Sequence, residues 1–235
     1  MYHGVRDGES GNPWVMPWLN FQKQVAALRR WGYTAIHLRD LVMHIKGGMV
    51  LPHRPVILTF DDGFAELYDK VFPLLFGIQF TGTVFLPMDH LGKTNAWDKG
   101  KGLAQARLLS AAQAKELKKH GAEFGSHGLT HRALTGMPVK EIRRETGESK
   151  KKLEQLIGER VVSFAHPYNA WDELTLALTE EAGYECAVAI DSPARTMQDN
   201  LFLLRRVYMK PDDSLLDFRR KISIPYLRWR GYKKH

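Results

Sequence analysis

The sequence has a single cysteine, Cys186, among its 235 residues. One thiol can form neither an intramolecular disulfide nor a thiolate-based metal site. We expect Cys186 to be a small buried residue, because free cysteines are usually buried.

Long apolar segments are also missing. No stretch reaches the roughly 18 apolar residues of a transmembrane helix, and the opening MYHGVRDGES lacks the basic and apolar regions of a signal peptide. No Ser/Gly-rich linker or internal repeat divides the chain. Residues 1–235 are therefore expected to form a single domain.

Acidic residues are outnumbered, with 34 Lys and Arg against 26 Asp and Glu and a net charge of +8. Such a balance favours anionic surroundings. The final stretch, DFRRKISIPYLRWRGYKKH, mixes basic and aromatic residues as single-strand nucleic-acid binders do. We favour instead a terminal helix packed through its aromatic residues, with a solvated basic end that suits an anionic envelope surface, and we expect no nucleic-acid partner.

Apolar, β-branched runs alternate with helical patterns, which predicts a parallel sheet in a barrel-like or doubly wound α/β fold. The expected strands are YTAIHL (33–38), PVILTF (55–60), TGTVFL (81–86), AEFGS (122–126), VVSFAHP (161–167), YECAVAI (184–190) and LLRRVYM (203–209). The expected helices cover 20–32, 65–77, 109–121, 139–156, 171–183 and 214–222.

Two adjacent carboxylates, Asp61 and Asp62, end the run LTFDDGF. Reactive residues gather at the carboxyl ends of parallel strands. Neighbouring carboxylates repel each other there unless a cation lies nearby. Turn chemistry alone offers an alternative, in which Asp62-Gly63 forms a turn and Asp61 caps the next helix.

His127 and His131, in EFGSHGLTHRAL, also follow an expected strand. Their imidazoles can converge on one ion if the segment makes a helical turn, although a pair of surface histidines is the alternative. With Asp62 they form the His, His, carboxylate set that leaves coordination positions open and favours zinc. Asp61 is then available as the general base.

A third polar segment, SFAHPYNAWDE, follows another expected strand. Pro167 and Tyr168 can hold a rigid turn whose backbone N–H donates to an oxyanion. His166 is a candidate metal ligand, acid or substrate contact, with simple packing as the alternative.

In this order, TFDDG, SHGLTH and FAHPYN resemble the three motifs of the polysaccharide deacetylase family (carbohydrate esterase family 4). The likeness extends to LPHRPVILTFDDGF, TGTVFL, LGKTNAWD and LLRRVYM, so it covers nearly the whole chain. The resemblance implies a distorted (β/α) barrel of about seven parallel strands. It also implies a divalent metal, with Zn²⁺ expected and Co²⁺ or Ni²⁺ as alternatives, and removal of N-acetyl groups from N-acetylglucosamine polymers.

Carried over to this sequence, the resemblance makes Asp61 the base, Asp62, His127 and His131 the metal ligands, and the Tyr168 amide the oxyanion donor. Two departures stand out. Ala165 occupies the place where the third motif usually has the arginine that orients the base, and the family's late Leu-His motif is missing.

The poly-N-acetylglucosamine deacetylase subgroup supplies its acid from a Tyr-His near the start, which MYHGV resembles. We therefore expect His3 to protonate the leaving amine, and family members normally carry an apolar strand before this point. Arg206 is a candidate replacement for the missing arginine, with pairing to a surface carboxylate as the alternative. Trp97 and Asp98 could bind a sugar ring, or Trp97 could simply pin its loop.

Two other functions remain open from these residues. One is hydrolysis of a different small amide on the same metal site. The other is a catalytically weak, glycan-binding relative. The family resemblance places such proteins at the cell envelope or outside the cell.

Overall fold

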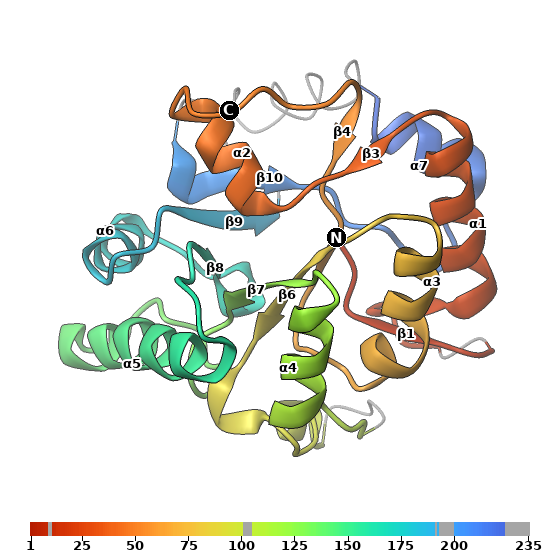
Figure 1. Cartoon of the computed structure of the whole chain (residues 1–235). Coiled ribbons are helices and arrows are strands. Elements are labelled where there is room, and N and C mark those ends of the chain that lie inside the picture. The colour runs from red at the N-terminus through yellow and green to blue at the C-terminus, as the bar shows by residue number, and fades with distance from the viewer. Residues whose placement is uncertain (9–10, 101–104, 191, 193–199, 224–235) are drawn as a thin grey trace.

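A six-stranded parallel sheet forms the centre of the computed structural model, which describes residues 1–8, 11–100, 105–190, 192 and 200–223 (Figure 1). In order across the sheet, its strands are β10 (Leu204–Arg206), β9 (Cys186–Ile190), β8 (Ser163–Ala165), β7 (Glu123–Ser126), β6 (Thr83–Leu86) and β5 (Thr59–Phe60). Two small parallel sheets accompany it, formed by β1 (Gly4–Arg6) with β2 (Val15–Pro17) and by β3 (Thr34–Ala35) with β4 (Pro55–Val56).

Helices surround this sheet (Figure 1). They are α1 (Trp18–Arg30), α2 (Leu38–Ile45), α3 (Phe72–Gly77), α4 (Ala111–Lys119), α5 (Val139–Ile157), α6 (Glu173–Glu181) and α7 (Leu215–Lys221). A π-helical turn, η1 (Leu67–Val71), precedes α3, and short 3₁₀ turns are η2 (Met88–His90), η3 (Ala96–Asp98), η4 (Pro167–Asn169) and η5 (Leu201–Leu203). Within the described ranges, no helix is long and apolar enough to cross a membrane.

The parallel sheet confirms the predicted α/β class, but it is a half-barrel of six strands among the described residues, not the distorted (β/α) barrel of about seven strands that was expected. The difference lies in YTAIHL, whose two strand residues pair with Pro55–Val56 in a sheet of their own. The run PVILTF is correspondingly divided between two sheets, as β4 and β5. The expected helices at 109–121 and 139–156 are present as α4 and α5.

The N-terminal segment connects the two edges of the main sheet. Tyr2 N donates to Thr59 O and Asp61 N donates to Tyr2 O, each at 2.9 Å. On its other side, Met1 N donates to Val207 O at 2.9 Å, and Met209 N donates to Met1 O at 3.3 Å. These bonds place His3 beside the carboxyl end of β5.

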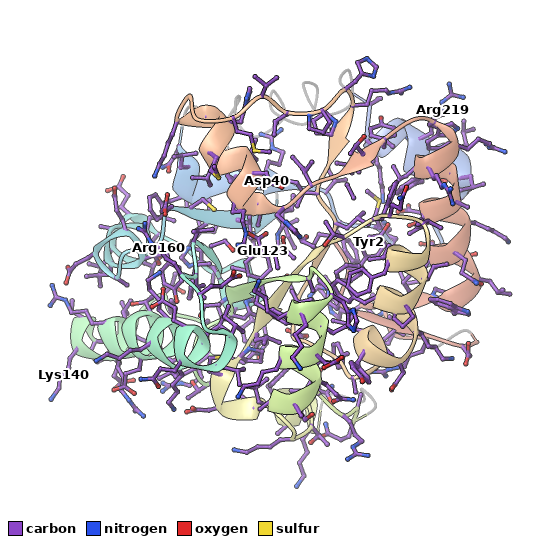
Figure 2. All side chains as sticks on the ribbon, viewed as in Figure 1. Tyr2, Asp40, Glu123, Lys140, Arg160 and Arg219 are labelled. Atoms are coloured by element: carbon purple, nitrogen blue, oxygen red, sulfur yellow. The ribbon has the colours of Figure 1, made fainter. Side chains whose placement is uncertain are left out.

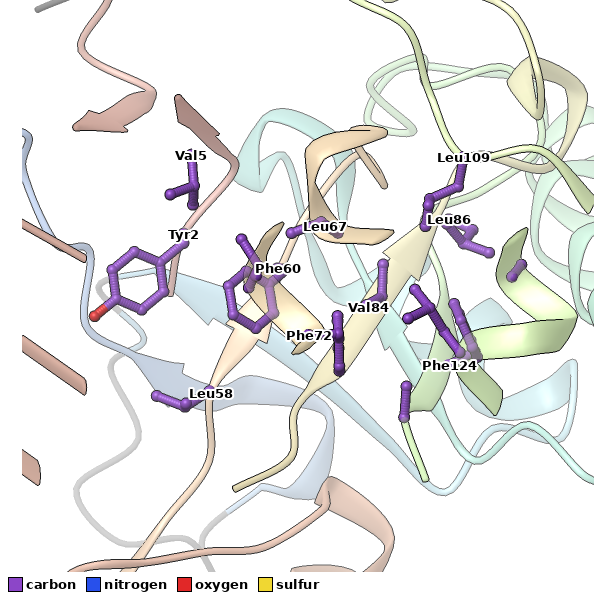
Figure 3. Packing of buried hydrophobic residues seen from close by; sticks show 14 of the residues in the cluster. Tyr2, Val5, Leu58, Phe60, Leu67, Phe72, Val84, Leu86, Leu109 and Phe124 are labelled. Carbon is purple, nitrogen blue, oxygen red and sulfur yellow. The ribbon is translucent and has the colours of Figure 1, made fainter. Parts of the chain in front are cut away.

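Aromatic and aliphatic side chains between the sheet and the helices form the core (Figure 3). The Tyr2 ring stacks on Phe60 with centroids 5.7 Å apart, and Phe60 contacts Phe72 of α3. Figure 2 shows Tyr2 and Glu123 inside the molecule, whereas Lys140, Arg160 and Arg219 point outward. Each large apolar side chain buried here contributes about 1.5–3 kcal/mol, so the N-terminal segment is well anchored.

Candidate active site

Polar residues collect in one pocket at the carboxyl edge of the main sheet. The pocket has a volume of about 200 Å³ and is partly open to solvent. Its lining includes the predicted site residues His3, Asp61, Asp62, Trp97, His127, His131, His166, Tyr168 and Arg206. Among the predicted site residues, only Pro167 does not line it. Pro167 is buried at the start of η4.

Asp62, His127 and His131 form the centre of this pocket. Asp62 Oδ1 lies 3.5 Å from His127 Nε2 and 3.1 Å from His131 Nε2. One potential ligand atom from each residue lies within 4.8 Å of the other two, and all three side chains are buried. The three residues follow β5 and β7, so the expected convergence at the sheet edge is present.

The protonation state of His127 indicates which kind of ligand Asp62, His127 and His131 can bind. His127 Nδ1 lies 2.7 Å from the carbonyl oxygen of Ala165, so Nδ1 carries the proton. Burial lowers the pKa of His127, which favours the neutral ring whose Nε2 lone pair faces Asp62. Asp62 Oδ1 accepts no hydrogen bond from the described residues. Lone pairs that face each other in a buried site are stabilised by a cation, so these residues fit a divalent metal.

Backbone geometry at two of these residues is strained. Asp62 has φ of 69° and His131 has φ of 56°, both in the left-handed region that non-glycine residues rarely adopt. Gly63, at φ of 70°, packs so closely that an added Cβ would lie 2.3 Å from Leu86 Cδ2. Such strain costs roughly 1–3 kcal/mol per residue and persists at functional sites.

Asp61 forms a bidentate ion pair with Arg206, at the end of β10. Arg206 Nη1 donates to Asp61 Oδ1 at 2.5 Å, and Nη2 donates to Oδ2 at 2.8 Å. Burial raises the pKa of Asp61, but the charge of Arg206, with those of His127 and His3, holds this pKa well below the ordinary range. Arg206 is thus paired with the buried carboxylate next to the Asp62, His127 and His131 group, and its partner is not a surface residue.

His3 enters the pocket from the N-terminal segment. Its ring lies 4.8 Å from the Trp14 ring, and its Nδ1 is buried without a hydrogen-bond partner among the described residues. Burial lowers the pKa of His3, whereas Asp62 and Asp61 raise it. The ring is therefore close enough to the carboxylates to respond to their charge.

The turn after β8 brings two more candidates to the pocket. Tyr168, at φ of 57°, has a half-exposed ring whose centroid lies 4.9 Å from the His131 ring. His166 is buried, and burial followed by the charges of His127 and Arg206 lowers its pKa to about 3. Asn169 ties this turn to β9, because its side chain donates to Ile190 O and accepts from Ile190 N.

Trp97, in η3, stacks on His131 with centroids 4.0 Å apart and an interplanar angle of 25°. The Trp97 ring also makes a perpendicular contact with the His90 ring, with centroids 4.9 Å apart. Asp98 accepts from Asn95 Nδ2 at 2.8 Å. Trp97 therefore covers a candidate ligand and also lines the pocket.

Several lining residues were not predicted from the sequence. Trp14 is 42% exposed and stands between His3 and Tyr208, with its ring centroid 4.9 Å from that of Tyr208. Asn95 and Asn169 lie in the same pocket wall. The quoted stretches LGKTNAWD and FAHPYN contain the two asparagines, but only their neighbours had a recognisable chemical signal.

A parallel α/β sheet whose carboxyl edge carries a buried carboxylate and two imidazoles defines a class of candidate metal-dependent enzymes. A sequence profile described as polysaccharide deacetylase matches residues 49–187, more than half of the chain. The chain therefore belongs to the polysaccharide deacetylase family.

Individual relatives extend this likeness along the chain. YxkH of Bacillus subtilis (strain 168), whose name places it among polysaccharide deacetylases, is 25% identical over 211 residues, covering 90% of this chain and 70% of the relative. The poly-beta-1,6-N-acetyl-D-glucosamine N-deacetylase of Staphylococcus aureus (strain MRSA252) is 23% identical over 201 residues, covering 82% and 67%. The structure of the Streptococcus pyogenes deacetylase PplD, in complex with acetate, matches with a TM-score of 0.81 and 19% identity, covering 94% of this chain and 96% of PplD. That likeness shows a shared fold.

Proposed function

We propose that this polysaccharide deacetylase removes N-acetyl groups from N-acetylglucosamine units, using a divalent metal held by Asp62, His127 and His131. The convergence of these three buried side chains carries the proposal. Two imidazoles and one carboxylate are borderline ligands, which favours Zn²⁺ over Mg²⁺ or Ca²⁺, with Co²⁺ and Ni²⁺ as substitutes. When bound, such an ion supplies Lewis acidity toward the amide carbonyl and makes water more acidic.

Asp61 is the proposed general base. Its carboxylate is buried beside Asp62, and the bond to Arg206 fixes its orientation and keeps it ionised. A carboxylate of low pKa is a weak base, so it needs an acidified water as its partner. Arg206 takes the place that Ala165 leaves empty in the third motif.

The remaining steps use two other residues that line the pocket, Tyr168 and His3. As water adds to the acetamide carbon, the Tyr168 amide is proposed to donate to the developing oxyanion, in the left-handed turn that η4 provides. His3 is proposed to protonate the sugar nitrogen as the C–N bond breaks. The products are acetate and a glucosamine unit, which accounts for every atom of the amide and the water.

The polymer is proposed from the relatives and from the pocket wall. The Staphylococcus aureus relative is named for poly-beta-1,6-N-acetyl-D-glucosamine. Trp97 and the exposed ring of Tyr168 both line the pocket, and aromatic faces suit the apolar faces of sugar rings. An N-acetylglucosamine polymer or oligomer is thus the expected substrate.

Acetate release from three substrate types tests this function: β-1,6-linked N-acetylglucosamine oligomers, chito-oligomers and small amides such as N-methylacetamide. We expect release from the β-1,6-linked oligomers, inhibition by a chelator and recovery with Zn²⁺. Release only from small amides would support a different hydrolase. Binding of oligomers without any acetate would support a glycan-binding relative.

A further inference from the structure

The segment between His127 and His131 is not helical. A helical turn would be one way for the two imidazoles to converge, but residues 127–131 contain no helix, with bends at Leu129 and Thr130, and Gly128 has φ of 77°. Backbone hydrogen bonds of a helix therefore do not fix the distance between the two imidazoles. Buried backbone groups must be satisfied in another way.

Glu145 of α5 satisfies the amides of this segment. Its Oε2 accepts from Leu129 N at 2.8 Å and from Thr130 N at 3.0 Å. Its Oε1 accepts from the Thr130 hydroxyl at 2.6 Å. Glu145 is only 5% exposed, although it belongs to a helix rich in solvent-facing charges.

Two carbonyls of the same segment accept hydrogen bonds from η2. Met88 N donates to Gly128 O at 3.0 Å, and Asp89 N donates to Leu129 O at 2.9 Å. Together, η2 and Glu145 hold the segment between the two histidines in place through hydrogen bonds to its carbonyls and amides. An added Cβ on Gly128 would lie 3.1 Å from Glu145 Oε2, which shows how closely the carboxylate approaches this backbone.

We propose that Glu145 is a positioning residue of the metal site, setting the separation of His127 and His131 through the backbone between them. This inference rests on the proposed metal site. The left-handed φ of His131 persists only if its surroundings impose it, and the Glu145 bonds end one residue before it. Metal–nitrogen bonds require about 2.0–2.1 Å, so a small shift of either imidazole weakens binding.

Metal affinity of chelator-stripped protein tests the proposal, measured by Co²⁺ competition titration and by the visible absorption of bound Co²⁺. We expect Glu145→Ala to weaken Co²⁺ binding by about 10–100-fold, as loss of outer-shell support does, and to alter the spectrum. Thr130→Val, which removes one bond, should have a smaller effect. Glu145→Gln should retain much of the affinity, because its amide oxygen can still accept from both N–H groups.

Thr146→Val is the matched control. Thr146 is the next residue on α5 and is fully buried, but within the described part of the chain its hydroxyl bonds only to the helix carbonyls of Ile142 and Arg143. We expect it to lower stability while leaving Co²⁺ affinity and spectrum unchanged. Hydrogen exchange supplies an independent readout, because the Leu129 and Thr130 amides should exchange faster in Glu145→Ala than in Thr146→Val.

Wild-type affinity in both Glu145→Ala and Thr130→Val would overturn the inference while leaving the proposed function intact. Equal loss of affinity in Thr146→Val would also overturn it, since the effect would then reflect general destabilisation. Failure of the wild-type protein to bind Co²⁺ would overturn the proposed metal site and this inference together. If Glu145→Ala does not fold, Thr130→Val decides the outcome, because wild-type Co²⁺ affinity and spectrum in that variant would overturn the inference.

Discussion

Arg206 holds both carboxylate oxygens of Asp61, at 2.5 and 2.8 Å, from a different strand than the one expected to supply an orienting arginine. The guanidinium arrives from β10, whereas the third motif follows β8 and has Ala165 in the corresponding place. Planar guanidinium suits this bidentate contact in a way that a lysine ammonium does not. In this chain an arginine on β10 therefore contacts both oxygens of this carboxylate.

Arg206→Met should impair the base. Burial raises the pKa of Asp61 and Arg206 opposes it, so removal of Arg206 raises this pKa. Because Asp61 acts when ionised, the acid limb of kcat/KM should move to higher pH and the maximum should fall about 10–100-fold. Arg206→Lys should recover the charge but only part of the rate.

The pH profile of kcat/KM measures both effects. Arg205→Lys is the control, since Arg205 bonds to Ser192 O and not to Asp61. An unshifted acid limb in Arg206→Met would show that Arg206 does not control the ionisation of Asp61. An unpaired buried carboxylate costs about 3–5 kcal/mol, so the folded fraction must be confirmed by circular dichroism.

Substitutions of Asp61 and His127 should distinguish loss of catalysis from loss of metal binding. Asp61→Asn removes the base but no ligand, so turnover should fall by about 10²–10⁴-fold with metal content unchanged. His127→Ala removes a ligand and should lose both metal and activity. Elemental analysis beside acetate assays distinguishes the two, and loss of metal from Asp61→Asn would contradict the assignment.

The loss of hydrolysis rate on substitution of His3 should be larger for substrates with a more basic leaving group. An amine must be protonated to depart, whereas a nitrophenolate need not be. His3→Ala should therefore lower amide hydrolysis by about 10²-fold or more and affect 4-nitrophenyl acetate hydrolysis far less. Equal losses on both substrates would indicate that His3 only supports the pocket, for which Trp14→Phe is a control.

His166 should make the metal-free protein sensitive to acid. Its pKa falls from 6.5 to about 3 in the folded state, because burial disfavours the charged ring. Between these values the unfolded chain binds more protons, so the free energy of unfolding decreases as pH falls. One such group contributes up to about 1.4 kcal/mol per pH unit.

His166→Phe should make this dependence shallower, since neither ring nitrogen of His166 has a partner among the described residues. Urea unfolding from pH 4 to pH 7 in the presence of a chelator measures the slope. The exposed His53→Asn serves as control, because solvent surrounds its ring in both states. An unchanged slope in His166→Phe would exclude His166 as a source of the acid sensitivity.

Local sequence patterns predicted most strands and the convergence of Asp62, His127 and His131, because each followed a short signal: an apolar run with polar residues at its end. These patterns did not predict which strands pair with each other or which side chains bond to distant backbone groups. YTAIHL reads as a strand, but only its pairing with Pro55–Val56 excludes it from the main sheet. Helix α2 begins at Leu38, inside that same run, because Glu123 accepts from the amides of Leu38 and Arg39.

Glu145 is a residue of the candidate site whose contacts also could not be predicted from local sequence patterns. It lies in VKEIRRETGESKKKLEQLI, where glutamates alternate with basic residues as on a solvent-facing helix. Burial and its bonds to Leu129 and Thr130 arise from tertiary packing of α5 on the segment after β7. A single sequence carries no local sign of such a contact.

Titration of chelator-stripped protein with Zn²⁺, with acetate release from N-acetylglucosamine oligomers as the readout, tests the metal site most directly. Activity should be absent without metal, rise linearly and level off at one equivalent, and this response should be missing in a variant with Asp62→Ala. Full acetate release by the metal-free protein, or an undiminished response in Asp62→Ala, would contradict the account.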